Sequence, residues 1–365
     1  MKVLAAAGGT AGHVNPMLAT ARELTERGHE VLAIGTMEGL EADLVPAAGL
    51  ELYPIAKIPL PRKPSLDLVR LPGRMRATVN ELRGLMRARS IDAVIGFGGY
   101  VSTPAYLAAR QEKIPVIIQE QNARPGLANK LGARWAKGVS LTFETTPLAA
   151  KNGITRVTGL PLRKEISDLA ADFQVPERRW ERRNAAAERF GLDPETPIVL
   201  VTGGSSGAQR LNVAFSQAAT DIRKHAQVLH ITGRGKSSDV DSSSTGEGYR
   251  VEEYVGDMEE AYAVADLVVT RSGAGMVAEL AALGIPAVVV PLAIGNGEQY
   301  LNAKTYIDAG AFTHIPNDEF TADRVRSEIV PLINPTTLKE RRDILLQSGV
   351  SNGGSAVADL VEECA

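Results

Sequence analysis

The sequence predicts an α/β protein with two Rossmann-like, doubly wound domains that face each other across a cleft. Short apolar runs rich in Val and Ile alternate with amphipathic helical segments along the chain, the pattern of parallel strands buried on both faces. A strand followed by a glycine-rich turn begins a series of such units at residue 2, and another about 195 residues later. The chain has 365 residues, more than the ~250–300 at which single cores stop growing.

The first series begins with a strand at Lys2–Ala7 and a glycine turn at Gly8–His13. We expect the next helix to start at Pro16 with Asn15 as its cap, because proline suits the first helical position. The turn has GGxxG spacing rather than GxGxxG, and the following strand, Val31–Ile34, ends without a ribose-binding acid. Both departures argue against a dinucleotide site.

The remaining elements follow in the same alternating order. Further strands are expected at Ile91–Phe97, Ile114–Ile118, Val139–Phe143, Ile154–Thr158, Ile198–Thr202, Val228–Thr232, Arg250–Val255, Leu267–Thr270 and Pro286–Val290. Helices are expected from Pro104, after Pro125, across 164–196, and from about Gln299, Ala322, Thr336 and Gly354. We therefore expect an N-terminal domain at 1–162 and a C-terminal domain at 163–340, with helices of 341–365 packing back on the N-terminal domain.

The stretch Asp266–Glu279 joins a buried strand to a glycine turn and a helix that ends at Gly284. Unpaired amides and the helix dipole favour negative charge at such a helix start. The turn therefore suits a phosphate or diphosphate, and Glu279 could accept hydrogen bonds from sugar hydroxyls. The alternative is an ordinary βα unit in which Glu279 only improves helix electrostatics.

Two further features lie where open α/β sheets bind ligands, at the carboxyl ends of strands. His13 sits in the first glycine turn, and a His pKa of ~6.5 would let it act as a general base. It could instead only bond backbone at a helix start. Four hydrogen-bonding residues, Gln119–Asn122, follow another strand; they could bind a ligand or cap the next helix.

Composition excludes several function classes. The Walker A spacing is absent, which argues against ATP hydrolysis. The pair Asp239 and Asp241 lies in a serine-rich stretch without a third ligand nearby, so neither a metal nor another cofactor is expected.

The lone cysteine, Cys364, fits a reducing compartment. No signal peptide and no apolar run of membrane-spanning length is seen, so we expect a cytosolic protein, peripheral to a membrane at most.

Charge is distributed unevenly. Residues 1–160 carry 20 Lys+Arg and 13 Asp+Glu, a net +7, whereas the remainder carries 20 and 30, a net −10. Residues 55–76 combine apolar side chains and bases with four prolines. They predict a surface for anionic lipid headgroups; the alternative is a loop and an amphipathic helix with a solvated basic face. Nucleic acid is not expected as a partner, because aromatics are sparse and no recognised motif occurs.

Several motifs together carry a family resemblance across nearly the whole chain: GGTAGHVNP, GFGGYVSTPA, QEQNARPGLAN, GGSSGAQRLN, EYVGDMEEAYAVADLVVTRSGA and GNGEQYLNA. The chain resembles the MurG family of peptidoglycan GlcNAc transferases, which has the GT-B glycosyltransferase fold, in its actinobacterial form. The resemblance implies GlcNAc transfer from UDP-GlcNAc to the C4 hydroxyl of lipid-linked MurNAc-pentapeptide, with inversion. It also implies a peripheral place on the cytoplasmic face of the cell membrane, and cell-wall synthesis proteins as further partners.

The resemblance also assigns roles to individual residues. His13 is the expected base, with Glu120 as a substitute; the donor would contact Thr10, Ala11, Gly12, Asn122, Arg163, Ser205, Val255, Ala274, Gly275, Met276, Val277, Ala278, Glu279 and Gln299. The helix after Gly273 would stabilise the departing UDP without a metal. Departures from the family pattern include Gln119 in place of His, and Gly275-Met276 in place of Leu-Thr. Without that hydroxyl, the turn would have to use backbone amides.

Two other functions remain open from the sequence. A GT-B enzyme could use UDP-GlcNAc differently, as an epimerase or a glycolipid synthase, and the product would separate these from the transferase. A non-enzymatic nucleotide-sugar sensor would bind UDP-GlcNAc but tolerate loss of His13.

Overall fold

A computed structural model describes residues 1–58, 66–204, 207–292, 297–348 and 352–365, excluding the side chains of 66–69 and 244. Ser205 and the middle of the predicted lipid-binding stretch, 59–65, lie outside the described residues. The chain divides into two compact units. Unit 1 comprises Met1–Arg163 and Asn352–Ala365, and unit 2 comprises Lys164–Ser351.

Unit 1 contains a seven-stranded sheet of order β3-β2-β1-β4-β5-β6-β7, in which every described strand pair is parallel. Its strands are β1 (Lys2–Ala6), β2 (Glu30–Gly35), β3 (Glu51–Pro54), β4 (Ala93–Gly96), β5 (Val116–Glu120), β6 (Gly138–Leu141) and β7 (Ile154–Val157). The central strands β1, β4 and β5 are almost wholly buried, as their apolar runs predict.

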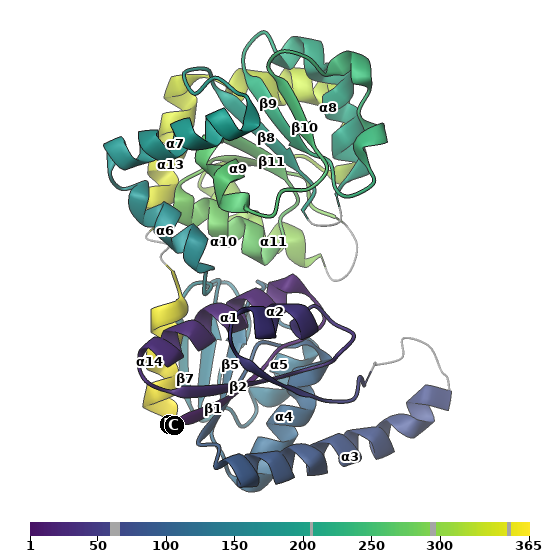
Figure 1. Ribbon diagram of the computed structural model, residues 1–365, viewed down its shortest axis with the longest axis vertical. Coiled ribbons are helices and arrows are strands. Elements are labelled where there is room, and N and C mark those ends of the chain that lie inside the picture. Colours follow the sequence, from purple (N-terminus) through teal and green to yellow (C-terminus); the bar gives the residue numbers. More distant parts are fainter. Residues whose placement is uncertain (59–65, 205–206, 293–296, 349–351) are drawn as a thin grey trace. The chain divides into compact units, whose positions relative to one another are not determined.

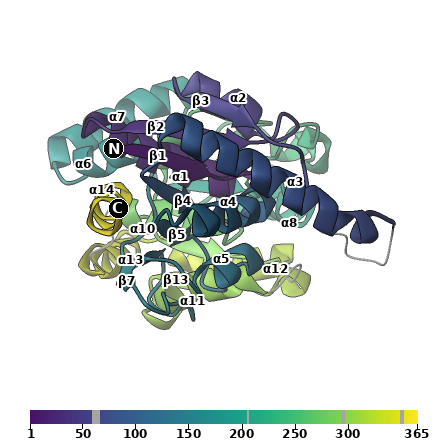
Figure 2. The same cartoon turned by 90° about the horizontal axis from the view of Figure 1, so that it is seen from below.

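Helices cover both faces of this sheet (Figures 1 and 2). They are α1 (Ala11–Glu26), α2 (Glu41–Ala47), α3 (Leu66–Arg89), α4 (Gly99–Glu112), α5 (Leu127–Gly132) and α14 (Gly354–Cys364). One hydrophobic cluster joins the sheet to α1, α2 and α14, and a second joins its other face to α3 and α4. Unit 1 is therefore a three-layer, doubly wound domain.

Two helices of unit 1 begin earlier than their prolines predict. α1 starts at Ala11 rather than Pro16, and α4 starts at Gly99 rather than Pro104, so both prolines lie inside a helix. The prediction was wrong because a proline near a helix start is tolerated where few intrahelical bonds are lost. As a consequence, the unpaired amides of α1 belong to the glycine turn itself.

The long helix α3 has two different halves. Its second half buries Val79, Leu82 and Met86 in the core of unit 1. The first half extends beyond the sheet (Figures 1 and 2), and over residues 70–77 none of its side chains is buried. None of the described helices has the length and apolar content that crossing a bilayer requires.

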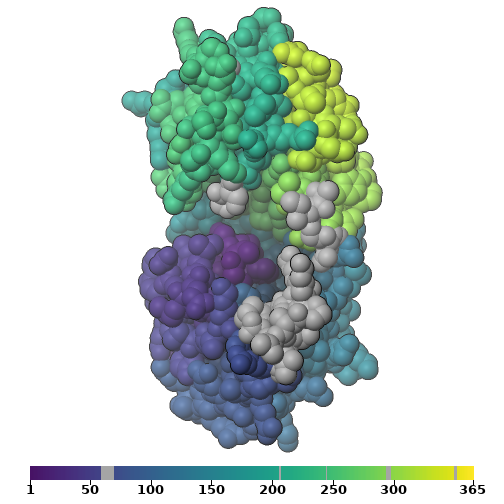
Figure 3. Space-filling model, turned by 90° about the vertical axis from the view of Figure 1, so that its right-hand side faces the viewer, coloured from purple at the N-terminus to yellow at the C-terminus, as the bar shows by residue number. Residues whose placement is uncertain are grey.

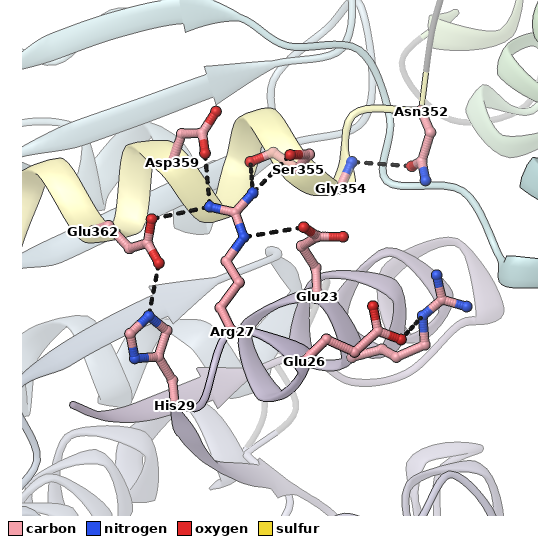
Figure 4. A network of polar contacts seen from close by, with 10 residues as sticks. Glu23, Glu26, Arg27, His29, Asn352, Gly354, Ser355, Asp359 and Glu362 are labelled. Atoms are coloured by element: carbon pink, nitrogen blue, oxygen red, sulfur yellow. Dashed lines mark hydrogen bonds and ion pairs between the residues drawn. The ribbon is translucent and has the colours of Figure 1, made fainter.

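The last helix, α14, packs on α1 through apolar contacts and an ion-pair network around Arg27 (Figure 4). The Arg27 guanidinium donates to Asp359 at 2.7 Å, to Glu362 at 2.9 Å and to Ser355, while its Nε donates to Glu23 at 3.0 Å. These acceptors raise the pKa of Arg27. The return to unit 1 begins at Asn352 and not at residue 341, because α13 (Pro335–Gln347) packs on α10 of unit 2.

Unit 2 contains a six-stranded parallel sheet of order β10-β9-β8-β11-β12-β13. Its strands are β8 (Ile198–Thr202), β9 (Gln227–Ile231), β10 (Tyr249–Glu252), β11 (Leu267–Thr270), β12 (Ala287–Val289) and β13 (Phe312–His314). Its longer helices are α6 (Lys164–Asp172), α7 (Pro176–Phe190), α8 (Gln209–Ile222), α9 (Met258–Val264), α10 (Ala274–Leu283), α11 (Glu298–Asp308) and α13. The short α12 (Ala322–Arg324) packs with α8 against one face of the sheet.

Candidate functional site

In unit 1 the strand order reverses between β1 and β4, so this pair marks the topological switch point of the sheet. Ligands of open α/β sheets bind beyond the carboxyl ends of the strands at that point. The turn after β1 carries Thr10, Ala11, Gly12 and His13, and Gly9, Thr10 and Gly12 are exposed. On the face in Figure 3, the start of the chain, in purple, reaches the surface of unit 1.

His13 lies in the first turn of α1, with its ring against the turn that follows β4. Its Nδ1 lies 2.8 Å from Thr10 Oγ1. Gly98 adopts a φ of +88°, and an added Cβ there would lie 3.4 Å from His13 Nε2, so glycine serves both the backbone conformation and the close approach. Burial lowers the pKa of His13, and the nearby Glu41 charge opposes this only in part. The imidazole is therefore neutral at pH 7, as a general base must be.

Glu120, the last residue of β5, is differently placed. Its side chain is 1% exposed. Oε1 accepts from the Asn122 amide at 3.0 Å, and Oε2 accepts from the Gly126 amide at 3.0 Å and from Asn129 Nδ2 at 2.9 Å. Burial raises its pKa, while these hydrogen bonds act in the opposite direction. Glu120 thus holds its own loop in shape.

Of the residues next to Glu120, Gln119 is buried and hydrogen-bonded, whereas Asn122 is half-buried. The Gln119 amide donates to Thr142 Oγ1 at 3.0 Å and accepts from Gln121 at 2.6 Å. Gln119, which departs from the family pattern, therefore stabilises the carboxyl end of β5. Asn122 is half-buried, and its backbone oxygen accepts from Thr146. Asn122 is therefore the member of this group that is not fully buried.

Glu41, at the start of α2, is a residue that the sequence analysis missed. Its Oε1 accepts from the Thr36 amide at 2.9 Å and the Thr36 hydroxyl at 2.8 Å, and its Oε2 accepts from the Gly9 amide at 3.2 Å. Burial by itself raises the pKa of Glu41, but the hydrogen bonds outweigh burial and lower it. A buried charge so bonded fixes the first glycine turn. Its one sequence signal is the flanking Gly35 and Gly39, where an added Cβ would meet the Glu41 side chain within 2.4 Å.

In unit 2 the strand order reverses between β8 and β11, and the turn after β11 leads into α10. Gly273 precedes the helix and supplies no side-chain cap, so the amides of Ala274, Gly275 and Met276 have no intrahelical acceptor. The hydroxyls of Thr270 and Ser272 beside them are buried without a partner in the described part of the chain. This combination of orphan donors suits an anion.

The predicted sugar contact, Glu279, lies further along α10. Glu279 is half-buried, and its Oε2 accepts from the Tyr262 hydroxyl at 2.8 Å. Met276 Sδ lies 3.2 Å from the same hydroxyl. Val277 and Ala278 are buried, and the Val277 amide donates to Gly273 O at 3.0 Å. Those two residues therefore support the turn from the core side.

The remaining predicted residues are spread over both units. Val255 follows β10 and is 7% exposed. Gln299 lies in α11, and its Oε1 accepts from the Leu292 amide at 2.9 Å. Arg163 is half-buried at the end of the first segment of unit 1. Within the described residues, no group of three or more His, Cys, Asp or Glu could hold a metal ion.

Comparison with known proteins identifies the family. Residues 3–141 match the glycosyltransferase family 28 N-terminal domain, and residues 198–355 match its C-terminal domain. The chain belongs to glycosyltransferase family 28. It is 43% identical over its full length to the UDP-N-acetylglucosamine--N-acetylmuramyl-(pentapeptide) pyrophosphoryl-undecaprenol N-acetylglucosamine transferase of Paenarthrobacter aurescens (strain TC1), of which 96% is covered.

Other members of the family agree. The enzyme of the same name from Clavibacter sepedonicus is 45% identical, over 99% of this chain and 95% of that protein. The crystal structure of Acinetobacter baumannii MurG is 29% identical, with a TM-score of 0.77 over 99% of both chains. The predicted resemblance to the MurG family and the predicted GT-B class of two doubly wound domains are thereby confirmed.

Proposed function

We propose that this chain transfers GlcNAc from UDP-GlcNAc to the C4 hydroxyl of undecaprenyl-pyrophosphoryl-MurNAc-pentapeptide. The observation that carries the proposal is full-length identity of 43% and 45% with enzymes named for this transfer. Two independent features support it. Unit 2 has orphan donors for an anion at the start of α10, and unit 1 has a histidine with a lowered pKa at its switch point.

The proposed reaction is a single displacement. The C4 oxygen attacks C1 of GlcNAc as His13 takes the hydroxyl proton, and the bond from C1 to the diphosphate oxygen breaks with its electron pair going to UDP. Attack from the opposite face turns the α-linked donor into a β-linked product. The amides of Ala274, Gly275 and Met276 would stabilise the charge on the departing diphosphate.

We assign the base to His13 rather than Glu120. Both oxygens of Glu120 accept from donors of the following loop and of α5, and the side chain is 1% exposed. His13 is half-buried and neutral, and its bond to Thr10 Oγ1 at 2.8 Å fixes the ring. In this assignment Glu120 keeps the Asn122 loop in shape and takes no proton.

The other residues keep the roles that the resemblance implies. Unit 1 would bind the acceptor and unit 2 the donor, with Val255 offering backbone groups to uracil and Glu279 accepting from ribose. Asn122 and Gln299 would bond GlcNAc hydroxyls, and Arg163 and Ser205 would contact the donor, the latter at a phosphate. Thr10, Ala11 and Gly12 would line the diphosphate, with Val277 and Ala278 supporting the turn of unit 2.

The lipid-linked acceptor places the reaction at a membrane surface, and we propose that unit 1 docks there, peripherally and on the cytoplasmic face. Within the described part of residues 55–76, Arg70, Arg74 and Arg76 are exposed on the projecting half of α3. The later bases of α3 have acidic partners on the protein: Arg83 and Arg87 bind Glu112, and Arg89 binds Glu51. We propose that the exposed bases in the first half of α3 meet anionic lipid headgroups. Partners among cell-wall synthesis proteins would meet the enzyme at the same membrane.

The test follows UDP release from UDP-GlcNAc with and without the lipid-linked MurNAc-pentapeptide, in the presence of a chelator. Wild type should release UDP only with the acceptor, and the disaccharide lipid should form. His13→Ala should lower kcat by about 10²–10⁴-fold while UDP binding is retained. His225→Ala, which removes an exposed histidine of unit 2, serves as the matched control and should be unaffected.

Three results would contradict parts of the proposal. UDP release without acceptor, or a different product, would favour the epimerase or glycolipid synthase. UDP-GlcNAc binding without turnover would favour a sensor. Activity in His13→Ala close to wild type would refute the base assignment.

A further inference from the structure

The hydroxyl of Tyr262 joins α9 to α10 at the predicted ribose site. Tyr262 is 1% exposed, so its ring is fixed in the core of unit 2. The hydroxyl donates to Glu279 Oε2 at 2.8 Å and lies 3.2 Å from Met276 Sδ. Because a thioether sulfur is a weak acceptor and a carboxylate a strong one, the single proton belongs to the carboxylate.

This contact restricts the orientation of the Glu279 side chain. Glutamate has three rotatable side-chain bonds, and fixing such a side chain has a substantial entropic cost. A carboxylate already held in one orientation in the free protein spares the ligand that cost. Each carboxylate oxygen has two acceptor positions, so Glu279 can accept from Tyr262 and from ligand hydroxyls together.

We propose that Tyr262 is a positioning residue that orients the Glu279 carboxylate toward the 2′- and 3′-hydroxyls of the donor ribose. The inference rests on the proposed function, since it assigns the nucleotide ribose to Glu279. It extends that function to specificity: the site selects ribonucleoside diphosphates over their 2′-deoxy forms because the acceptor for the 2′-hydroxyl is held in place before binding. A hydroxyl that finds no oriented acceptor contributes little.

Tyr262→Phe removes the hydroxyl and leaves the buried ring. The readout is calorimetric binding of UDP and of 2′-deoxy-UDP, with kcat and KM for UDP-GlcNAc measured in parallel. In wild type UDP should bind more tightly than 2′-deoxy-UDP. In Tyr262→Phe the Kd for UDP should rise about 3- to 10-fold, as for one lost hydrogen bond. The Kd for 2′-deoxy-UDP, which keeps only the 3′-hydroxyl contact with Glu279, should rise less, so the preference shrinks.

Two further variants distinguish a positioning role of Tyr262 from a general destabilisation of unit 2. Tyr249→Phe removes the hydroxyl of another buried tyrosine of unit 2, which lies 2.8 Å from His230 Nδ1, and should leave the UDP preference unchanged. In a Glu279→Gln background Tyr262→Phe should have little added effect on the preference, because the two side chains act as one unit.

The outcomes are distinguishable from failure of the transferase proposal. An equal rise in both Kd values, or none, would overturn the role of Tyr262 while leaving the transferase proposal intact. Failure of acceptor-dependent UDP release with normal UDP binding would overturn the transferase proposal, and the Kd ratio would still decide the role of Tyr262. A wild type that binds UDP and 2′-deoxy-UDP equally would overturn the inference.

Discussion

Acid should destabilise unit 2 through one buried histidine. His230 in β9 is fully buried; its Nδ1 lies 2.8 Å from the Tyr249 hydroxyl and its Nε2 lies 3.0 Å from Asn212 Oδ1. This arrangement satisfies a neutral ring that donates through Nε2 and accepts through Nδ1. Burial lowers the pKa of His230 from 6.5 to about 3.

The sign and the size of the effect follow from linkage. The folded-state pKa lies below the unfolded value, so the unfolded chain binds the proton first, and stability present above about pH 6.5 is lost as the pH falls. At pH 5 an unfolded His of pKa 6.5 is mostly protonated, whereas the folded His230 is still neutral. The difference corresponds to about 2 kcal/mol of unfolding free energy relative to pH 8.

The assay is urea unfolding of unit 2 at pH 8 and pH 5. The chain has two tryptophans, so Trp135→Phe leaves Trp180 of α7 as a reporter on unit 2 and avoids merging two domain transitions. His230→Gln offers one donor and one acceptor but does not titrate. Between pH 8 and pH 5 the unmutated His230 protein should lose about 2 kcal/mol more than His230→Gln. Equal losses in the two proteins would refute the reasoning, and His225→Gln should behave as the unmutated protein does.

Two further changes act on unit 1. Arg27→Ala should lower the free energy of unfolding of unit 1 by about 2 kcal/mol, because several charge-assisted hydrogen bonds to α14 are lost. As a control, Arg156→Ala removes a single exposed ion pair with Glu363 and should lower it by less than about 1 kcal/mol. Equal losses for the two variants in urea unfolding would argue against the Arg27 network. Charge reversal of Arg70 and Arg74 to Glu should reduce binding to anionic vesicles, each base contributing about 1 kcal/mol, while UDP binding is unchanged. If the variant sediments with the vesicles as wild type does, this surface is not the lipid-binding surface.

The order of strands and helices was predictable from the sequence wherever a strand is buried on both faces of its sheet. Inner strands such as Ile198–Thr202 and Leu267–Thr270 are mostly apolar runs, because both faces of a parallel sheet are covered. The edge strands Glu51–Pro54 and Phe312–His314 were missed. Most of their side chains are half-buried or exposed, so they lack the apolar run that makes an inner strand visible.

The candidate residues were likewise found by their local pattern. Glycine turns between a strand and a helix identify His13 and the start of α10, because both the turn and the unpaired amides are properties of neighbouring residues. The family resemblance added the roles, which single residues cannot supply. The exact helix starts were not found: prolines suggested Pro16 and Pro104, whereas α1 and α4 begin at Ala11 and Gly99.

Tertiary structure alone decided which hydrogen bonds each polar group makes. From sequence, Glu120 and His13 were both candidates for the base; the structure gives Glu120 three donors, two from the loop that follows it and one from Asn129 of α5, and leaves His13 half-buried. Glu41 and Tyr262 had no sequence signal strong enough to suggest a role, because their partners come from other elements. Sequence thus determined which elements form and where their turns carry candidate ligand-binding groups. The protonation and orientation of those groups depend on burial and on hydrogen bonds between distant residues, which only the folded chain provides.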